Sequence, residues 1–97
     1  MAVMVGAEVR AGNLGRIVTS RLGRDRGAVY LVIAEAGPSL VLVADGRGRP
    51  VTRPKRKNIK HLEFGSVAPG VVPKLTAGQA LTDEEIRAAI AAAAVPG

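Results

Sequence analysis

The residues of this chain best suited to chemistry are its arginines and lysines. Seven basic residues and no acidic one lie between Arg47 and Lys60, in a chain whose net charge is +6. Guanidinium and ammonium groups displace counterions from phosphates, and the planar arginine fork meets two phosphate oxygens at once. This run therefore predicts contact with a polyanion. Two alternatives stay open at this point: a run that resembles a nuclear-localisation signal, and a run that only improves solubility.

A second basic group lies in the loop 23–27, Gly-Arg-Asp-Arg-Gly. The flanking segments 16–21 and 28–34 are rich in β-branched and apolar residues, which predicts two strands joined as a hairpin. We expect Gly23 and Gly27 to adopt positive φ, which a Cβ would oppose. Asp25 is expected to shape the loop by accepting hydrogen bonds from nearby backbone amides. The two arginines beside it then face solvent or a partner.

Three further short strands are expected at residues 39–44, 49–53 and 59–62. Asp45-Gly46 is typical of a type I′ turn, and residues 55–58 suggest a tight basic turn between the last two strands. The strand at 39–44 carries apolar residues on both faces. Five short strands without an intervening helix indicate a mostly β fold, a small antiparallel barrel over residues 14–64.

The remaining segments are expected to lie outside this barrel. Residues 1–13 read as an N-terminal tail, and residues 65–80, rich in proline and glycine, as a linker. A short C-terminal helix is predicted over 81–95, with Thr82 and Glu85 as a capping box and Leu81 and Ile86 as a hydrophobic staple. The helix is predicted to run to about residue 94. Whether it docks on the barrel, docks on a partner or frays is left open.

Three blocks of sequence resemble a known family. They are Gly-Arg-Ile-Val-Thr-Ser-Arg-Leu-Gly-Arg-Asp-Arg-Gly at 15–27, Leu-Val-Ala-Asp-Gly at 42–46 and Arg-Pro-Lys-Arg-Lys-Asn-Ile-Lys-His-Leu at 53–62. In this order they resemble the small bacterial KOW-domain RNA-binding proteins, relatives of large-subunit ribosomal proteins of archaea and eukaryotes. The resemblance covers residues 14–62. It implies an SH3-like barrel and a ribosome-associated role in translation, with ribosomal RNA as the partner.

The residues expected to contact RNA form two groups that barrel closure would bring together. Aromatic residues make up only 2% of the chain, so backbone charge and the shape of folded RNA are favoured over base stacking. The candidate RNA-binding residues are Arg21, Arg24 and Arg26 on the first hairpin, and Arg47, Arg49, Arg53, Lys55, Arg56, Lys57 and Lys60 on the second. Gly23, Gly27, Asp45 and Gly46 are expected to be structural turn residues.

Other classes of function find little support in the residues. The chain has no cysteine and one histidine, and it lacks a phosphate-binding loop motif, so we expect neither an enzyme nor a cofactor or metal site. No small-molecule substrate or membrane contact is expected, and the composition fits a cytoplasmic protein. Two alternatives stay open. One is a protein-interaction module that docks through its C-terminal helix, and the other is a DNA-binding or nucleoid protein.

Overall fold

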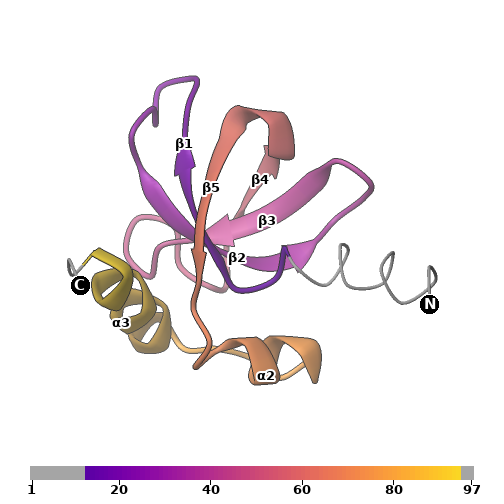
Figure 1. Cartoon of the computed structure of the whole chain (residues 1–97), viewed down its shortest axis with the longest axis vertical. Coiled ribbons are helices and arrows are strands. Elements are labelled where there is room, and N and C mark those ends of the chain that lie inside the picture. The colour runs from indigo at the N-terminus through magenta and orange to yellow at the C-terminus, as the bar shows by residue number, and fades with distance from the viewer. Residues whose placement is uncertain (1–12, 95–97) are drawn as a thin grey trace.

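A computed structural model describes residues 13–94 of the 97-residue chain. The predicted N-terminal tail, apart from Asn13, lies outside these residues. Strands come first and two helices follow (Figure 1). The elements are β1 (Arg16–Ser20), β2 (Val29–Glu35), β3 (Leu40–Ala44), β4 (Lys55–Asn58), the 3-10 turn η1 (Ile59–His61), β5 (Leu62–Val67), α2 (Val72–Thr76) and α3 (Asp83–Ala94).

The five strands form one antiparallel sheet in the order β4-β3-β2-β1-β5, so β4 and β5 are its edges. In the central hairpin Ile17 of β1 lies opposite Leu31 of β2. On its other side β1 pairs with β5, where Val18 is opposite Phe64. The prediction of a mostly β fold with five antiparallel strands is confirmed.

One face of the sheet curls around its own apolar side chains. Val18, Val32 and Val43, from three adjacent strands, have no exposed surface. Three more buried residues complete this inner cluster, and Ile59 of η1 packs against it. The further members are Tyr30, Val41 and Leu62. Successive side chains of a strand point to opposite faces of the sheet. The apolar residues that alternate with this inner cluster therefore lie on the other face and need a second layer of structure to bury them.

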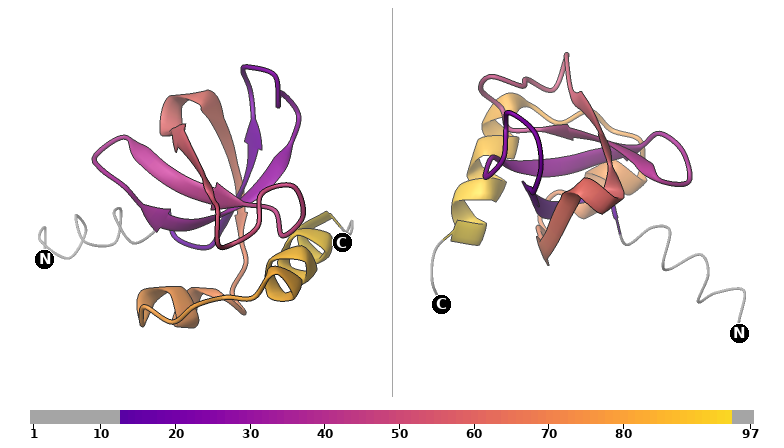
Figure 2. Two further views of the ribbon diagram at one scale, coloured as in Figure 1. Left: turned by 180° about the vertical axis from the view of Figure 1, so that it is seen from behind. Right: turned by 90° about the horizontal axis from the view of Figure 1, so that it is seen from above.

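The second cover comes from the C-terminal segment. Ile17, Leu31 and Ala44, on the other face of the strands, form a buried cluster with Val71, Leu81 and Ile86. Figures 1 and 2 show α2 and α3 together on one side of the sheet. Full burial of a side chain such as Ile86 contributes about 1.5–3 kcal/mol. Of the fates left open for α3, docking on its own sheet is the one observed.

The start of α3 follows its predicted capping pattern. The Glu85 amide donates to Thr82 Oγ1 over 3.1 Å, and the Thr82 amide donates to Glu85 Oε1 over 2.9 Å. Leu81 and Ile86, the two staple residues, are both buried. Lys74 of α2 pairs with Glu85, and this hydrogen bond, helped by the Thr82 amide, holds the pKa of the Glu85 carboxyl below its usual range. The capping box and the staple are confirmed, and α3 is helical up to Ala94, the last residue that the structure describes.

The first three predicted strands are confirmed, whereas the last two are wrong. Residues 49–53 form a loop, because Asp45 Oδ1 accepts hydrogen bonds from the backbone amides of Arg47 and Arg49, at 2.8 and 2.9 Å. Pro50 has no amide to donate to a ladder. The predicted basic turn at 55–58 is instead strand β4, which pairs with β3. The final strand begins three residues later than predicted, after η1.

The segment predicted as a linker is part of the fold. It contains the end of β5 and all of α2, and the predicted boundary after residue 64 falls inside β5. The Ala68 amide donates to the Gly15 carbonyl over 2.8 Å, and Val71 is buried in the second cluster. Among the described residues, no helix combines the length and apolar character needed to cross a membrane.

Candidate nucleic-acid interface

The loop between β1 and β2 carries the first group of candidate residues. Gly23 and Gly27 both have φ of +91°, as predicted. The Gly27 amide donates to the Ser20 carbonyl over 2.8 Å, and the Ala28 amide donates to the Asp25 carbonyl over 2.8 Å. The loop therefore has a single defined shape, with Arg24 and Arg26 exposed and Asp25 partly buried.

The Asp25 side chain is the centre of a polar cluster. Ser20 Oγ donates to Asp25 Oδ1 over 2.9 Å, and Tyr30 Oη donates to Oδ2 over 2.7 Å. Lys57 Nζ lies 3.1 Å from Oδ1, and Lys55 Nζ lies 3.2 Å from Oδ2. The predicted shaping role of Asp25 thus uses side-chain donors, from strands on both sides of the loop, rather than neighbouring backbone amides.

This cluster shifts the titration of two of its members. Burial opposes ionisation of Asp25, but the hydrogen bonds from Tyr30, Ser20, Lys57 and Lys55 outweigh it and hold the carboxyl pKa well below its usual range. Burial, together with the bond to Asp25, raises the pKa of the Tyr30 phenol to about 12. At neutral pH the carboxylate is therefore charged and the phenol is a hydrogen-bond donor.

Two lysines that were predicted to contact RNA, Lys55 and Lys57, belong to this cluster. Lys57 is only 8% exposed, and its ammonium is engaged by Asp25. Lys55 is more open, but it pairs with the same carboxylate. Since β4 side chains alternate, Arg56 between them is exposed. Of the β4 residues that were predicted to contact RNA, Lys57 is therefore buried and Arg56 is open to solvent.

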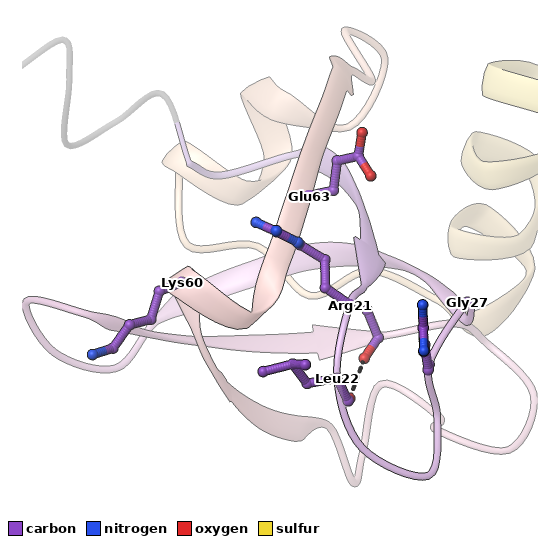
Figure 3. A pocket seen from close by; sticks show the side chains of 7 residues that line it. Arg21, Leu22, Gly27, Lys60 and Glu63 are labelled. Atoms are coloured by element: carbon purple, nitrogen blue, oxygen red, sulfur yellow. Dashed lines mark hydrogen bonds between the residues drawn. The ribbon is translucent and has the colours of Figure 1, made fainter.

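Three other candidate residues meet in a groove at the end of the sheet. Arg21 and Arg26 from the β1–β2 loop line it together with Lys60 of η1, and the Arg21 amide donates to the His61 carbonyl over 2.9 Å. The groove has a volume of about 520 Å3. Figure 3 shows Arg21 and Lys60 with Leu22, Gly27 and Glu63 around the hollow. Figures 1 and 2 show that this end of the sheet lies away from α2 and α3.

The β3–β4 loop places the remaining candidates elsewhere. Arg47, Arg49 and Arg53 are exposed, but Arg47 lines a separate hollow beside α3, together with Arg87. Gly46 has φ of +77°, whereas no non-glycine residue among the described ones has positive φ. Asp45-Gly46 is thus a turn, as predicted, but not of type I′. Within residues 13–94 the two basic groups meet at two places: Lys60 lies with Arg21 and Arg26 in the groove, and Lys55 and Lys57 pair with Asp25 of the β1–β2 loop.

Sequence reasoning missed the residues that organise this site. Ser20 and Tyr30 each lie five residues from Asp25, and both point to the inner face of the sheet. The two residues lie at equal distances along the chain from Asp25, one on each strand of the predicted hairpin. This symmetric spacing is the sequence signal that could have revealed them. Leu22 and Glu63, which line the groove, were also not predicted.

No protein-family model and no curated protein matches this chain. Within residues 13–94, no group of three or more histidine, cysteine or acidic side chains is placed to hold a metal ion.

Proposed function

We propose that this protein is a non-catalytic RNA-binding domain of the KOW type, with an SH3-like barrel as its fold. It binds folded RNA through phosphates, and ribosomal RNA on the ribosome is the proposed partner. The ribosomal part of the proposal rests on the resemblance of the three sequence blocks. The binding part rests on the arrangement of charge described above.

The observation that carries the proposal is the groove at the end of the sheet. Arg21, Arg26 and Lys60 come from two segments far apart in the sequence and line one hollow. In the part of the chain that the structure describes, none of the three forms an ion pair. Glu63 also lines the hollow, but it pairs with none of these cations among the described residues. Three cations against one carboxylate leave a net positive charge that attracts an anion, and RNA supplies a phosphate at each nucleotide.

The aromatic residues favour recognition of backbone and shape over extended base stacking. Tyr30 is 4% exposed and binds Asp25, so its ring faces the core. Phe64 is half-buried, and the Arg16 guanidinium carbon lies 5.4 Å from its ring centroid. Neither ring offers the open platform on which single-strand binders stack successive bases.

The proposal is tested by the salt dependence of RNA binding. The logarithm of the binding constant falls linearly with the logarithm of salt concentration, and each phosphate contact contributes about 0.7–0.9 to the slope. Arg26→Gln should lower the slope by about one contact's worth. Arg47→Gln removes the same charge beside α3 and is the matched control, for which a smaller change is expected. If substitution of the groove residues leaves the salt slope unchanged, the proposed binding site is wrong.

A DNA-binding or nucleoid role uses the same phosphate chemistry and needs a separate measurement. Competition between folded RNA and duplex DNA at one salt concentration distinguishes the two, with RNA expected to win. Crosslinking in cells, followed by sequencing of the bound nucleic acid, then identifies the RNA. The third possibility, a protein-interaction module, was based on a C-terminal helix free to dock on a partner. It is less favoured, because Ile86 of α3 is already buried against the sheet.

A further inference from the structure

The groove between the β1–β2 loop and η1 contains more than phosphate-binding groups. Leu22, in its lining, is 55% exposed and is one of few large apolar side chains on the described surface. A groove that bound only phosphates would have no use for an apolar side chain among its cations. The faces of nucleobases, in contrast, are apolar and become available when a base leaves its helix.

A carboxylate lies on the same side of the sheet as these residues. Glu63 is opposite Thr19 in the β1–β5 pairing, and Arg21 follows Thr19 by two residues, so Arg21 and Glu63 leave the same face. Glu63 makes no ion pair within residues 13–94. A carboxylate repels phosphate but accepts hydrogen bonds from N–H groups. Its presence in a cationic groove favours a ligand that combines negative charge with hydrogen-bond donors.

We propose that this groove binds one unpaired nucleotide of a folded RNA, with its base against Leu22 and guanine preferred. The inference rests on the proposed function and names the feature of RNA that the site recognises. Arg26 and Lys60 take the flanking phosphates, while Glu63 accepts from the edge of the base. Guanine is preferred because its Watson–Crick edge presents two adjacent N–H donors, which match the two carboxylate oxygens.

The size and shape of the groove agree with such a ligand. Its volume of about 520 Å3 lies within the range of about 300–1,000 Å3 that small-ligand sites occupy. In Figure 3 Leu22 lies between Lys60 and Gly27, with Glu63 beyond Arg21. Gly27 lines the groove beside Arg26 and carries no side chain, so at this position a ring can approach the backbone closely.

The test compares a blunt RNA duplex with the same duplex carrying a single bulged guanosine, adenosine or uridine. Binding to the full-length protein is measured by fluorescence anisotropy at one salt concentration. A leucine offers a base a smaller contact than an aromatic ring does, so we expect about fivefold tighter binding of the guanosine bulge than of the blunt duplex. Leu22→Ala should reduce this ratio to near one without changing affinity for the blunt duplex.

Two further variants make the outcome specific. Glu63→Gln should abolish the preference of guanosine over uridine, because an amide presents one acceptor and adds a donor. Val29→Ala shortens another exposed apolar side chain, beside α3, and should leave all ratios unchanged. Equal binding of blunt and bulged RNA, or a ratio unaffected by Leu22→Ala, overturns this inference alone. Absence of salt-dependent binding to any of the RNAs overturns the proposed function, and this inference with it.

Discussion

Asp25, in the loop between β1 and β2, and Lys57, in edge strand β4, form an ion pair of 3.1 Å between residues 32 positions apart. The loop leads into β2, and strand β3 lies between β2 and β4 in the sheet. The pair therefore ties the loop that carries Arg24 and Arg26 to the far edge of the curled sheet. A structural ion pair thus sets the position of the proposed binding residues.

Replacing Asp25 by asparagine should destabilise the protein markedly. Lys57 would keep its buried position with its carboxylate partner removed, and the loss of one partner of a buried pair typically costs about 3–5 kcal/mol. Because both side chains retain some exposure, we expect about 2–3 kcal/mol here. Urea unfolding followed by circular dichroism measures the change. Glu84→Gln, on the exposed side of the first turn of α3, is the control and should change stability little.

The same cluster predicts loss of stability in acid. The pKa of Asp25 is lower in the folded protein than its ordinary value of 3.8. The unfolded chain therefore takes up a proton more readily than the folded one as pH falls. The contribution of Asp25 is complete above the ordinary value and disappears as pH drops below it. Unfolding measured from about pH 7 to about pH 2 should show this loss, and Asp25→Asn should reduce the pH dependence.

At alkaline pH the dependence of stability on pH has the opposite sign, and Tyr30 is the group responsible. Its pKa is raised from 10.0 to about 12, so the folded state favours the protonated phenol. The stabilisation is fully present below pH 10.0 and is lost as pH rises toward about 12. Tyr30→Phe should flatten the stability profile over this interval. An unchanged profile in that variant would contradict the hydrogen bond from Tyr30 to Asp25.

Local sequence signals predicted the central hairpin, its two positive-φ glycines and the capping of α3. Each depends on residues close together in the chain, so turn chemistry and capping preferences were sufficient. Strand β4 was missed because a run of basic residues suggests a solvated turn. Lys57 tolerates burial only because Asp25, 32 positions away, neutralises it. No local sequence pattern around Lys57 predicts an ion-pair partner so far away in the chain.

The candidate site was predicted by residue type and only partly by position. Arg21, Arg24 and Arg26 follow from the hairpin alone. The meeting of Arg21 and Arg26 with Lys60 depends on η1, which returns the chain to the end of β1. The burial of Val71 similarly depends on the outer face of the sheet, which a Pro/Gly-rich segment does not reveal. Both features depend on tertiary contacts, which local sequence patterns do not show. For this reason the sequence predicted a linker in a segment that is part of the fold.

Glycine substitutions should separate backbone strain from steric conflict. Gly27 has φ of +91° and open space around it, so Gly27→Ala should cost only the strain, about 1 kcal/mol. Gly46 has φ of +77°, and a Cβ there would lie 2.5 Å from the Asp83 carbonyl oxygen. Gly46→Ala should therefore destabilise clearly more than Gly27→Ala. Gly48→Ala, with neither constraint, is the control, and thermal melting ranks the three.

Larger side chains at the loop glycine carry a stronger prediction. A β-branched residue is strained at positive φ, so Gly27→Val should destabilise by about 1–3 kcal/mol. Melting of this variant at the temperature of the parent would contradict the loop conformation.

Truncation should show that the fold needs its C-terminal segment. A chain ending at residue 64 loses half of β5, and it also loses Val71 and Ile86, which cover Ile17 and Leu31. We expect such a chain to lack cooperative unfolding in a circular dichroism melt, whereas a chain ending at residue 94 should melt like the parent. A stable, cooperatively folded 1–64 fragment would show that the second apolar cluster is dispensable.

Lys57 and Lys60 lie three residues apart, and exchanging each for glutamine removes the same charge with opposite expected results. Lys60 is exposed and lines the groove, so Lys60→Gln should lower the salt slope of RNA binding by about 0.7–0.9 and leave the melting temperature unchanged. Lys57 is 8% exposed and bound to Asp25, so Lys57→Gln should reduce stability by about 1–3 kcal/mol and leave the slope unchanged in the folded protein. Slopes and melts of both variants, measured in one buffer, distinguish the surface cation from the core cation. Equal slope changes in the two variants would place Lys57 at the interface and contradict the division of the basic residues proposed here.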